Sequence, residues 1–215
     1  MSNQFSTVDF SFEAPYLVRG KTPKEAKRIW ILFHGYGQNI EFFSKKFQQY
    51  EKSDCLIIPQ GLSLFYLDNK YRKVGASWLT KEYREYGRKN QINYIHQIIK
   101  KELGDIDPND KELIIFGFSQ GVATASRVVS ELNLKPDHLI FYAGNPAHDI
   151  SFPLKLKPNT QVHFVYGDKD EYITEENATK IIDYIKDLTK ITPEVMRYQG
   201  LHTINSSILG TIITS

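Results

Sequence analysis

The chain has 215 residues, of which 41% are hydrophobic and 24% are charged, a balance typical of a globular domain with a substantial core. Its 27 basic and 25 acidic residues give a net charge of +2, so electrostatics favour neither nucleic acid nor an anionic membrane as a partner. The sequence has no apolar run near the roughly 20 residues that a membrane span needs, and its first residues lack the pattern of a signal peptide. We therefore expect a single cytoplasmic domain over residues 1–215, without stable membrane insertion.

The first segment alternates polar and apolar residues between positions 7 and 12, which is typical of a half-buried strand. A second short strand is predicted over residues 16–19, after the turn-like tripeptide Glu13-Ala14-Pro15. We therefore predict an antiparallel hairpin at the edge of a sheet.

A strand that is buried on both faces is predicted over residues 28–33, which read Arg-Ile-Trp-Ile-Leu-Phe. Residues 40–50 follow as a helix that Asn39 can cap. A second apolar strand over residues 55–58 begins with Cys55, the single cysteine, which we interpret as an inert core thiol. Strand, helix and strand at this spacing indicate a parallel sheet with right-handed crossovers.

Residues 62–78 form an excursion that carries many aromatic residues, with a turn near residues 68–70. A small hairpin is the structure that this pattern favours. The hairpin either packs its own aromatic residues against the sheet edge, or forms a wall or lid of an apolar substrate pocket.

The rest of the chain alternates strands and helices. Strands are predicted over residues 113–116, 138–142, 161–166 and 193–198, and helices over residues 82–103, 120–132 and 174–189 and from residue 203 or 204 onward. The whole pattern predicts a three-layer α/β protein, in which a mostly parallel twisted sheet carries antiparallel N-terminal edge strands.

The central apolar strand runs directly into Gly117-Phe118-Ser119-Gln120-Gly121, and a helical pattern follows. In this context of strand, sharp turn and helix, a Gly-x-Ser-x-Gly sequence holds its serine hydroxyl out of the sheet as a nucleophile. A serine hydroxyl needs a base, so the motif predicts an acid and a histidine further along the chain.

Reactive groups follow other strands at the same edge of the sheet, because the carboxyl ends of parallel strands lie together. His34-Gly35-Tyr36 follows the first parallel strand, Asp168 and Asp170 follow the next-to-last, and His202 follows the last. The order Ser, Asp, His is that of an α/β-hydrolase triad.

Together, Gly-x-Ser-x-Gly at residues 117–121, His-Gly-Tyr-Gly at residues 34–37, Gly-Asp-Lys-Asp at residues 167–170 and Gly-Leu-His at residues 200–202 resemble the phospholipase/carboxylesterase family of α/β-hydrolases. This family includes acyl-protein thioesterases and bacterial carboxylesterases. The resemblance extends from about Arg28 to the C-terminus.

The resemblance implies specific roles for residues at these positions. It makes Ser119, Asp170 and His202 the catalytic triad and the backbone N–H groups of Tyr36 and Gln120 the oxyanion hole. Ser77-Trp78 resembles the Ser-Trp that borders the acyl pocket of the family, which makes Trp78 a substrate-binding candidate. Leu79-Thr80 stands where the family has Phe-Asp, so the acyl-chain preference of the family does not transfer.

Several residues have a competing interpretation. Asp168 lies closer to the strand end than Asp170 and is the other candidate acid, although a Gly-Asp turn often uses its Asp to cap the backbone. Trp78 is also suited to plain core packing. His148 follows a strand in a loop that can line the pocket, whereas we interpret His34 as a residue that orients the oxyanion loop. His96 and His163 are interpreted as structural or surface residues.

The sequence thus favours a serine hydrolase that acts on a small-molecule carboxylic ester or thioester, without a metal or other cofactor, as a monomer or homodimer. A dinucleotide site would require a small residue at Ile40, where bulk prevents close packing of helix and strand. The remaining alternatives are a non-catalytic binding protein on the same fold and a peptidase or amidase.

Overall fold

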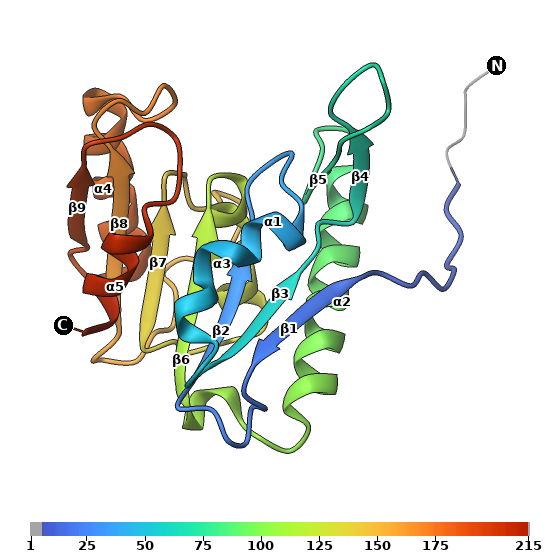
Figure 1. The fold of residues 1–215 in the computed structure, drawn as a ribbon, viewed down its shortest axis with the longest axis horizontal. Coiled ribbons are helices and arrows are strands. Elements are labelled where there is room, and N and C mark those ends of the chain that lie inside the picture. The colour runs from blue at the N-terminus through green and yellow to red at the C-terminus, as the bar shows by residue number, and fades with distance from the viewer. Residues whose placement is uncertain (1–5, 215) are drawn as a thin grey trace.

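The computed structural model describes residues 6–214. Its main sheet has seven strands in the order β1-β3-β2-β6-β7-β8-β9 (Figure 1). The strands are β1 (Tyr16–Gly20), β2 (Arg28–Phe33), β3 (Cys55–Pro59), β6 (Glu112–Phe118), β7 (His138–Tyr142), β8 (Gln161–Gly167) and β9 (Glu194–Tyr198). All neighbouring pairs are parallel except β1 and β3, which are antiparallel. The predicted mostly parallel sheet with an antiparallel N-terminal edge is therefore confirmed.

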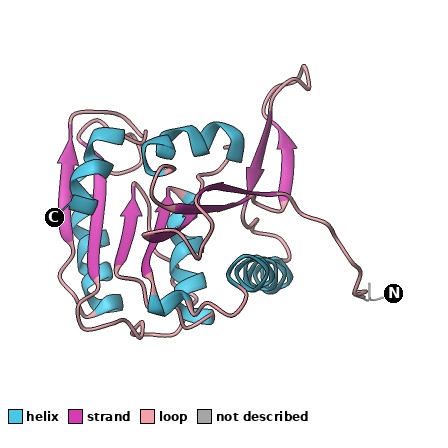
Figure 2. Ribbon diagram, turned by 60° about the horizontal axis from the view of Figure 1, so that its bottom comes forward, coloured by secondary structure: helices cyan, strands magenta, loops and turns pink. Residues whose placement is uncertain are grey.

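Helices lie on either side of this sheet (Figure 2). They are α1 (Ile40–Ser44), α2 (Arg84–Leu103), α3 (Gln120–Glu131), α4 (Glu175–Thr189) and α5 (Ser206–Thr214), with short 3-10 helices η1 (Lys45–Tyr50) and η2 (Pro108–Asp110). None of the helices within residues 6–214 is both long and apolar enough to cross a bilayer.

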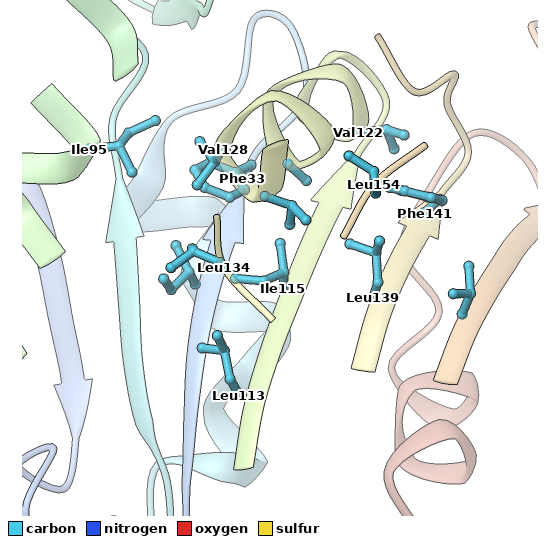
Figure 3. Close-up of a cluster of buried hydrophobic side chains, with 14 of the residues drawn as sticks. Phe33, Ile95, Leu113, Ile115, Val122, Val128, Leu134, Leu139, Phe141 and Leu154 are labelled. Carbon is cyan, nitrogen blue, oxygen red and sulfur yellow. The ribbon is translucent and has the colours of Figure 1, made fainter. Parts of the chain in front are cut away.

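Two separate apolar clusters hold the layers together because each central strand buries side chains on both faces. In β2, Ile31 packs into a cluster with Ile95 of α2 and Val128 of α3, part of which is drawn in Figure 3. The neighbouring Leu32 packs into the opposite cluster with Phe47 of η1. This is the three-layer arrangement predicted from the continuous apolar strands.

The aromatic excursion is a two-stranded hairpin of β4 (Ser63–Tyr66) and β5 (Val74–Ser77), as the sequence favoured. It stands at the carboxyl edge of the main sheet (Figure 1). An isolated bridge between Gln38 and Ala76 connects it to the loop that follows β2.

The predicted N-terminal hairpin is wrong in its first strand. Residues 7–12 form no strand, and β1 pairs only with β3 among the described residues. A three-residue hairpin loop normally requires a residue in the left-handed region, and Glu13-Ala14-Pro15 offers neither Gly nor Asn. Pro15 also restricts Ala14 to extended conformations, so the chain continues straight into β1.

The last helix also begins later than the predicted residue 203 or 204. It starts at Ser206, because residues just before it are held in a loop. The Tyr198 hydroxyl donates to the carbonyls of Leu201 and Thr203. The Asn205 side chain accepts from the Ser207 N–H group at 3.0 Å, as an N-cap residue does.

His163 of β8 is fully buried near the amino ends of the strands, with its ring stacked on His138 of β7. Burial, with a smaller contribution from the charge of His138, lowers the pKa of His163 to about 4. This holds although Glu194 Oε2 lies 3.2 Å from His163 Nδ1. The imidazole is therefore neutral in the folded protein at neutral pH.

We expect His163 to make the protein less stable as the pH falls. Its pKa is about 4 when folded and 6.5 in the reference state, so between these values the unfolded chain binds the proton and the folded chain does not. At pH 5 this preferential protonation of the unfolded chain lowers the free energy of unfolding by about 2 kcal/mol. Urea unfolding should show that the free energy of unfolding falls less between pH 7 and pH 5 in His163→Asn than in the wild type. The exposed His96 provides the control, because His96→Asn should leave the loss unchanged.

Candidate active site

Ser119 lies at the sharp turn between β6 and α3. Its backbone has φ 53° and ψ −117°, a strained conformation for a residue with a side chain. The Ser119 N–H group donates to the Tyr142 carbonyl of β7 at 2.8 Å, and its carbonyl accepts from the Val122 N–H group of α3 at 3.0 Å. A Cβ atom at Gly121 would lie 2.1 Å from the Phe33 carbonyl oxygen, so glycine is required where α3 passes the end of β2.

The loop after β2 presents the peptide between Gly35 and Tyr36 in a defined orientation. The Gly35 carbonyl accepts from the His34 Nδ1–H group at 2.7 Å and from the Gln38 N–H group at 3.2 Å. Because this peptide is trans, the Tyr36 N–H group points in the opposite direction. Within residues 6–214 that N–H group donates to no protein acceptor, so it is free to bind an anionic oxygen.

His34 can hold this loop only as a neutral imidazole. Its Nε2 atom accepts from the Gly61 N–H group at 3.0 Å and lies 3.1 Å from Gln60 Nε2, which assigns the proton to Nδ1. Burial lowers the pKa of His34 to about 4. The position of His34 agrees with its interpretation as a residue that orients the oxyanion loop.

Gln120 follows Ser119 and connects the turn to the hairpin. Its Oε1 atom accepts from the Trp78 N–H group at 3.0 Å, and its Nε2 atom donates to Ser77 Oγ and to the Leu79 carbonyl, both at 3.0 Å. Its backbone N–H group belongs to the first turn of α3, where no intrahelical acceptor exists. The residue therefore fixes both the start of α3 and the end of β5.

Asp170 and His202 meet above the end of β8. His202 Nδ1 lies 2.8 Å from Asp170 Oδ2. The other oxygen of Asp170 accepts from the N–H groups of Tyr172 and Ile173 at 2.8 and 3.1 Å. Asp168 instead accepts from the Gly200 N–H group at 2.9 Å. Of the two candidate acids, Asp170 is thus the one that contacts the imidazole.

Two aromatic rings enclose the His202 imidazole. The Phe118 ring centroid lies 5.0 Å away and the Tyr172 centroid 4.7 Å away. Because Phe118 precedes Ser119, this contact brings His202 to the nucleophile turn. Among the hydrogen bonds of the described residues, none joins Ser119 Oγ to His202, a contact that often tightens only when substrate binds.

Two buried tyrosines hold the loop that carries His202. The Tyr198 hydroxyl donates to the carbonyls on both sides of His202, those of Leu201 (3.1 Å) and Thr203. The Tyr142 hydroxyl accepts from the Asn205 N–H group at 2.8 Å, and the Tyr142 and Tyr198 rings pack with centroids 6.0 Å apart. Neither tyrosine was identified from the sequence. Their only signal is that each is the last residue of its strand, Tyr142 of β7 and Tyr198 of β9.

The two substrate-binding candidates, Trp78 and His148, differ in their exposure. Trp78 is 3% exposed, packs its ring on His34 with centroids 4.7 Å apart, and donates from Nε1 to the His34 carbonyl at 2.8 Å. This burial favours the core-packing interpretation. His148 is exposed and packs on Tyr184 of α4.

The hairpin borders the oxyanion loop directly. The Phe65 ring of β4 packs on Tyr36 with centroids 4.9 Å apart, and the Gly37 N–H group donates to the Ala76 carbonyl of β5 at 2.8 Å.

A separate hollow of about 450 Å³ lies between α2 and the N-terminal segment, away from Ser119. No cluster of metal-ligating side chains occurs within residues 6–214.

Residues 17–215 match the family model described as Phospholipase/Carboxylesterase. The chain belongs to this family. No curated protein matches it in sequence, so the further comparison rests on solved structures.

Three of the similar structures carry descriptions of hydrolases. Esterase PE8 is 22% identical, with a TM-score of 0.64 over 94% of this chain and 95% of that chain. Acyl-protein thioesterase 2 from Zea mays is 14% identical, with a TM-score of 0.66 over 94% and 97%. A carboxylesterase from Mesorhizobium loti is 13% identical, with a TM-score of 0.71 over 94% and 95%. At these identities the likeness shows the α/β-hydrolase fold that the phospholipase/carboxylesterase family shares.

We expect Tyr198→Phe to loosen the His202 loop, because the carbonyls of Leu201 and Thr203 lose their side-chain donor. The free energy of unfolding should fall by about 1–2 kcal/mol in urea titrations. Tyr172→Phe is the matched control, since the Tyr172 side chain is 64% exposed and should tolerate loss of its hydroxyl. Equal stability of Tyr198→Phe and the wild type would contradict the proposed role of the hydroxyl.

Proposed function

We propose that this chain is a serine hydrolase that cleaves carboxylic esters or thioesters of small molecules through a covalent acyl-enzyme. The observation that carries the proposal is the hydrogen bond between His202 Nδ1 and Asp170 Oδ2, made beside the strained turn of Ser119. Membership of the phospholipase/carboxylesterase family supports the same reaction class.

In the proposed first step, Ser119 Oγ attacks the acyl carbonyl carbon while the proton of its hydroxyl moves to His202 Nε2. Nε2 is available because the Nδ1 proton is engaged by Asp170. The carboxylate of Asp170 is itself fixed by the N–H groups of Tyr172 and Ile173. It therefore holds the ring orientation and stabilises the imidazolium that forms.

The carbonyl oxygen becomes an oxyanion as the new bond forms. The N–H groups of Tyr36 and Gln120 are proposed to bind this oxyanion. One such donor typically lowers the activation free energy by about 3 kcal/mol. Collapse of the intermediate breaks the bond to the leaving alcohol or thiol, which takes the proton from His202. Water then attacks the acyl-enzyme with His202 as base, releasing the acid and restoring Ser119.

A direct test replaces the nucleophile. We expect Ser119→Ala to lower kcat on p-nitrophenyl esters by roughly 10³-fold or more, because no other hydroxyl replaces the attacking group. Ser119→Ala should also abolish covalent labelling by a fluorophosphonate probe, whereas Ser207→Ala, at an exposed position of α5, should label normally. Full turnover by Ser119→Ala would refute the proposal. A wild-type protein that is folded but neither labels nor hydrolyses esters would instead favour a non-catalytic binding protein.

The acid can be assigned by comparing two Asp-to-Asn variants. Asp170→Asn should lower kcat by roughly 10²–10⁴-fold with little change in stability, because a neutral amide no longer stabilises the His202 imidazolium. Asp168→Asn keeps an oxygen acceptor for the Gly200 N–H group, so its kcat should stay within about threefold of the wild type. The reverse order of effects would transfer the role to Asp168.

A further inference from the structure

The N-terminal segment of residues 7–12, here called the arm, continues from the start of β1 and runs away from the sheet (Figure 1). Its three large apolar side chains alternate with polar ones and are exposed: Val8 by 84%, Phe10 by 75% and Phe12 by 64%. An extended segment with one apolar face is suited to pair with the open edge of a sheet.

The outer edge of β1 is such an edge, since β1 is the terminal strand of the main sheet. The Lys21 N–H group donates to the Asp54 carbonyl of the antiparallel neighbour at 2.9 Å. By the alternation of an antiparallel ladder, the N–H and C=O groups of Tyr16 and Val18 therefore point away from β3. The pairing of Tyr16 with Pro59, which has no N–H group, agrees with this direction.

One antiparallel register fits the arm to this edge. Centred on Ala14, it places Phe12 opposite Tyr16, Phe10 opposite Val18, and the apolar side chains of the arm on the same face as those of β1. The missing N–H group of Pro15 faces β3 in this register and is not needed for the new pairing.

The same register also joins opposite charges. Asp9 lies opposite Arg19, on the face away from Phe10. Arg19 is now paired only weakly, with its NH1 atom 3.8 Å from Glu51, and its Nε atom is buried without a hydrogen bond. A carboxylate at position 9 of an added strand would supply a partner for this guanidinium.

The arm that fills the edge of β1 must come from a different chain. To reach its own β1 it would have to reverse direction within Glu13-Ala14-Pro15, where no residue has a positive φ and none is Gly or Asn. In a two-fold pair of chains, the straight segment through Ala14 makes the identical register without a turn, because each arm lies along the β1 strand of the other chain. We propose that this protein forms a homodimer by reciprocal exchange of residues 7–12 onto β1.

Engineered cysteines at the paired charges test the exchange. Residues 9 and 19 face each other at a non-hydrogen-bonded position, the spacing at which a cross-strand disulfide can form. The full-length double variant Asp9→Cys, Arg19→Cys should oxidise to a covalent dimer of twice the chain mass on a non-reducing gel and return to monomer with reductant. The only natural cysteine, Cys55, is buried and does not interfere.

The control variant Asp9→Cys, Val18→Cys places the two thiols on opposite faces and should remain reduced. A disulfide within a single chain of the Asp9→Cys, Arg19→Cys variant would overturn the proposal, because it shows the arm folded onto its own β1. Failure to oxidise would also overturn it. Without engineered cysteines, sedimentation should give a dimeric mass for the wild type and a monomeric mass for Phe10→Asp, and a monomeric wild type at its highest soluble concentration would contradict the exchange.

Discussion

The close passage of α3 beside the end of β2 is the constraint on which the candidate site depends. Any side chain at Gly121 would collide with the Phe33 carbonyl, and with glycine there the helix can begin directly above the sheet. This proximity places Ser119 next to the loop that starts at His34. Backbone packing, rather than a contact between side chains, thus brings the turn of Ser119 close to the loop that carries Tyr36.

Hydrogen bonds from other protein groups hold His34 and Asp170 at this edge of the sheet, which gives the site its rigidity. His34 remains neutral so that it can donate to Gly35 and accept from Gly61. Asp170 receives N–H groups on one oxygen and the imidazole on the other. The Asp170 carboxylate and the peptide between Gly35 and Tyr36 are therefore each held by groups that take no part in the proposed chemistry.

The main parallel strands, their parallel direction and the placement of Ser119, Asp170 and His202 at one edge could be predicted because they follow from apolar runs and from short motifs. Contacts between residues far apart in the sequence could not be predicted. Nothing local in the sequence indicates that Tyr198 reaches the carbonyls beside His202, or that the Gln120 side chain reaches Leu79. The hairpin predicted over residues 7–19 is wrong for a different reason: residues 7–12 alternate polar and apolar residues, but the turn after them lacks a residue able to reverse the chain.

The attachment of the β4–β5 hairpin has a consequence for how this fold can diversify. Hydrogen bonds of Ala76, Ser77 and Leu79 join its base to the carboxyl edge of the main sheet. Its far end, around residues 67–73, makes its backbone bonds within the hairpin itself. Insertions or exchanges at that far end can reshape the surface of the hairpin while Ser119, Tyr36 and Gln120 keep their places. The outer part of the hairpin is thereby structurally separable from the part that holds Gln120 and the loop after β2.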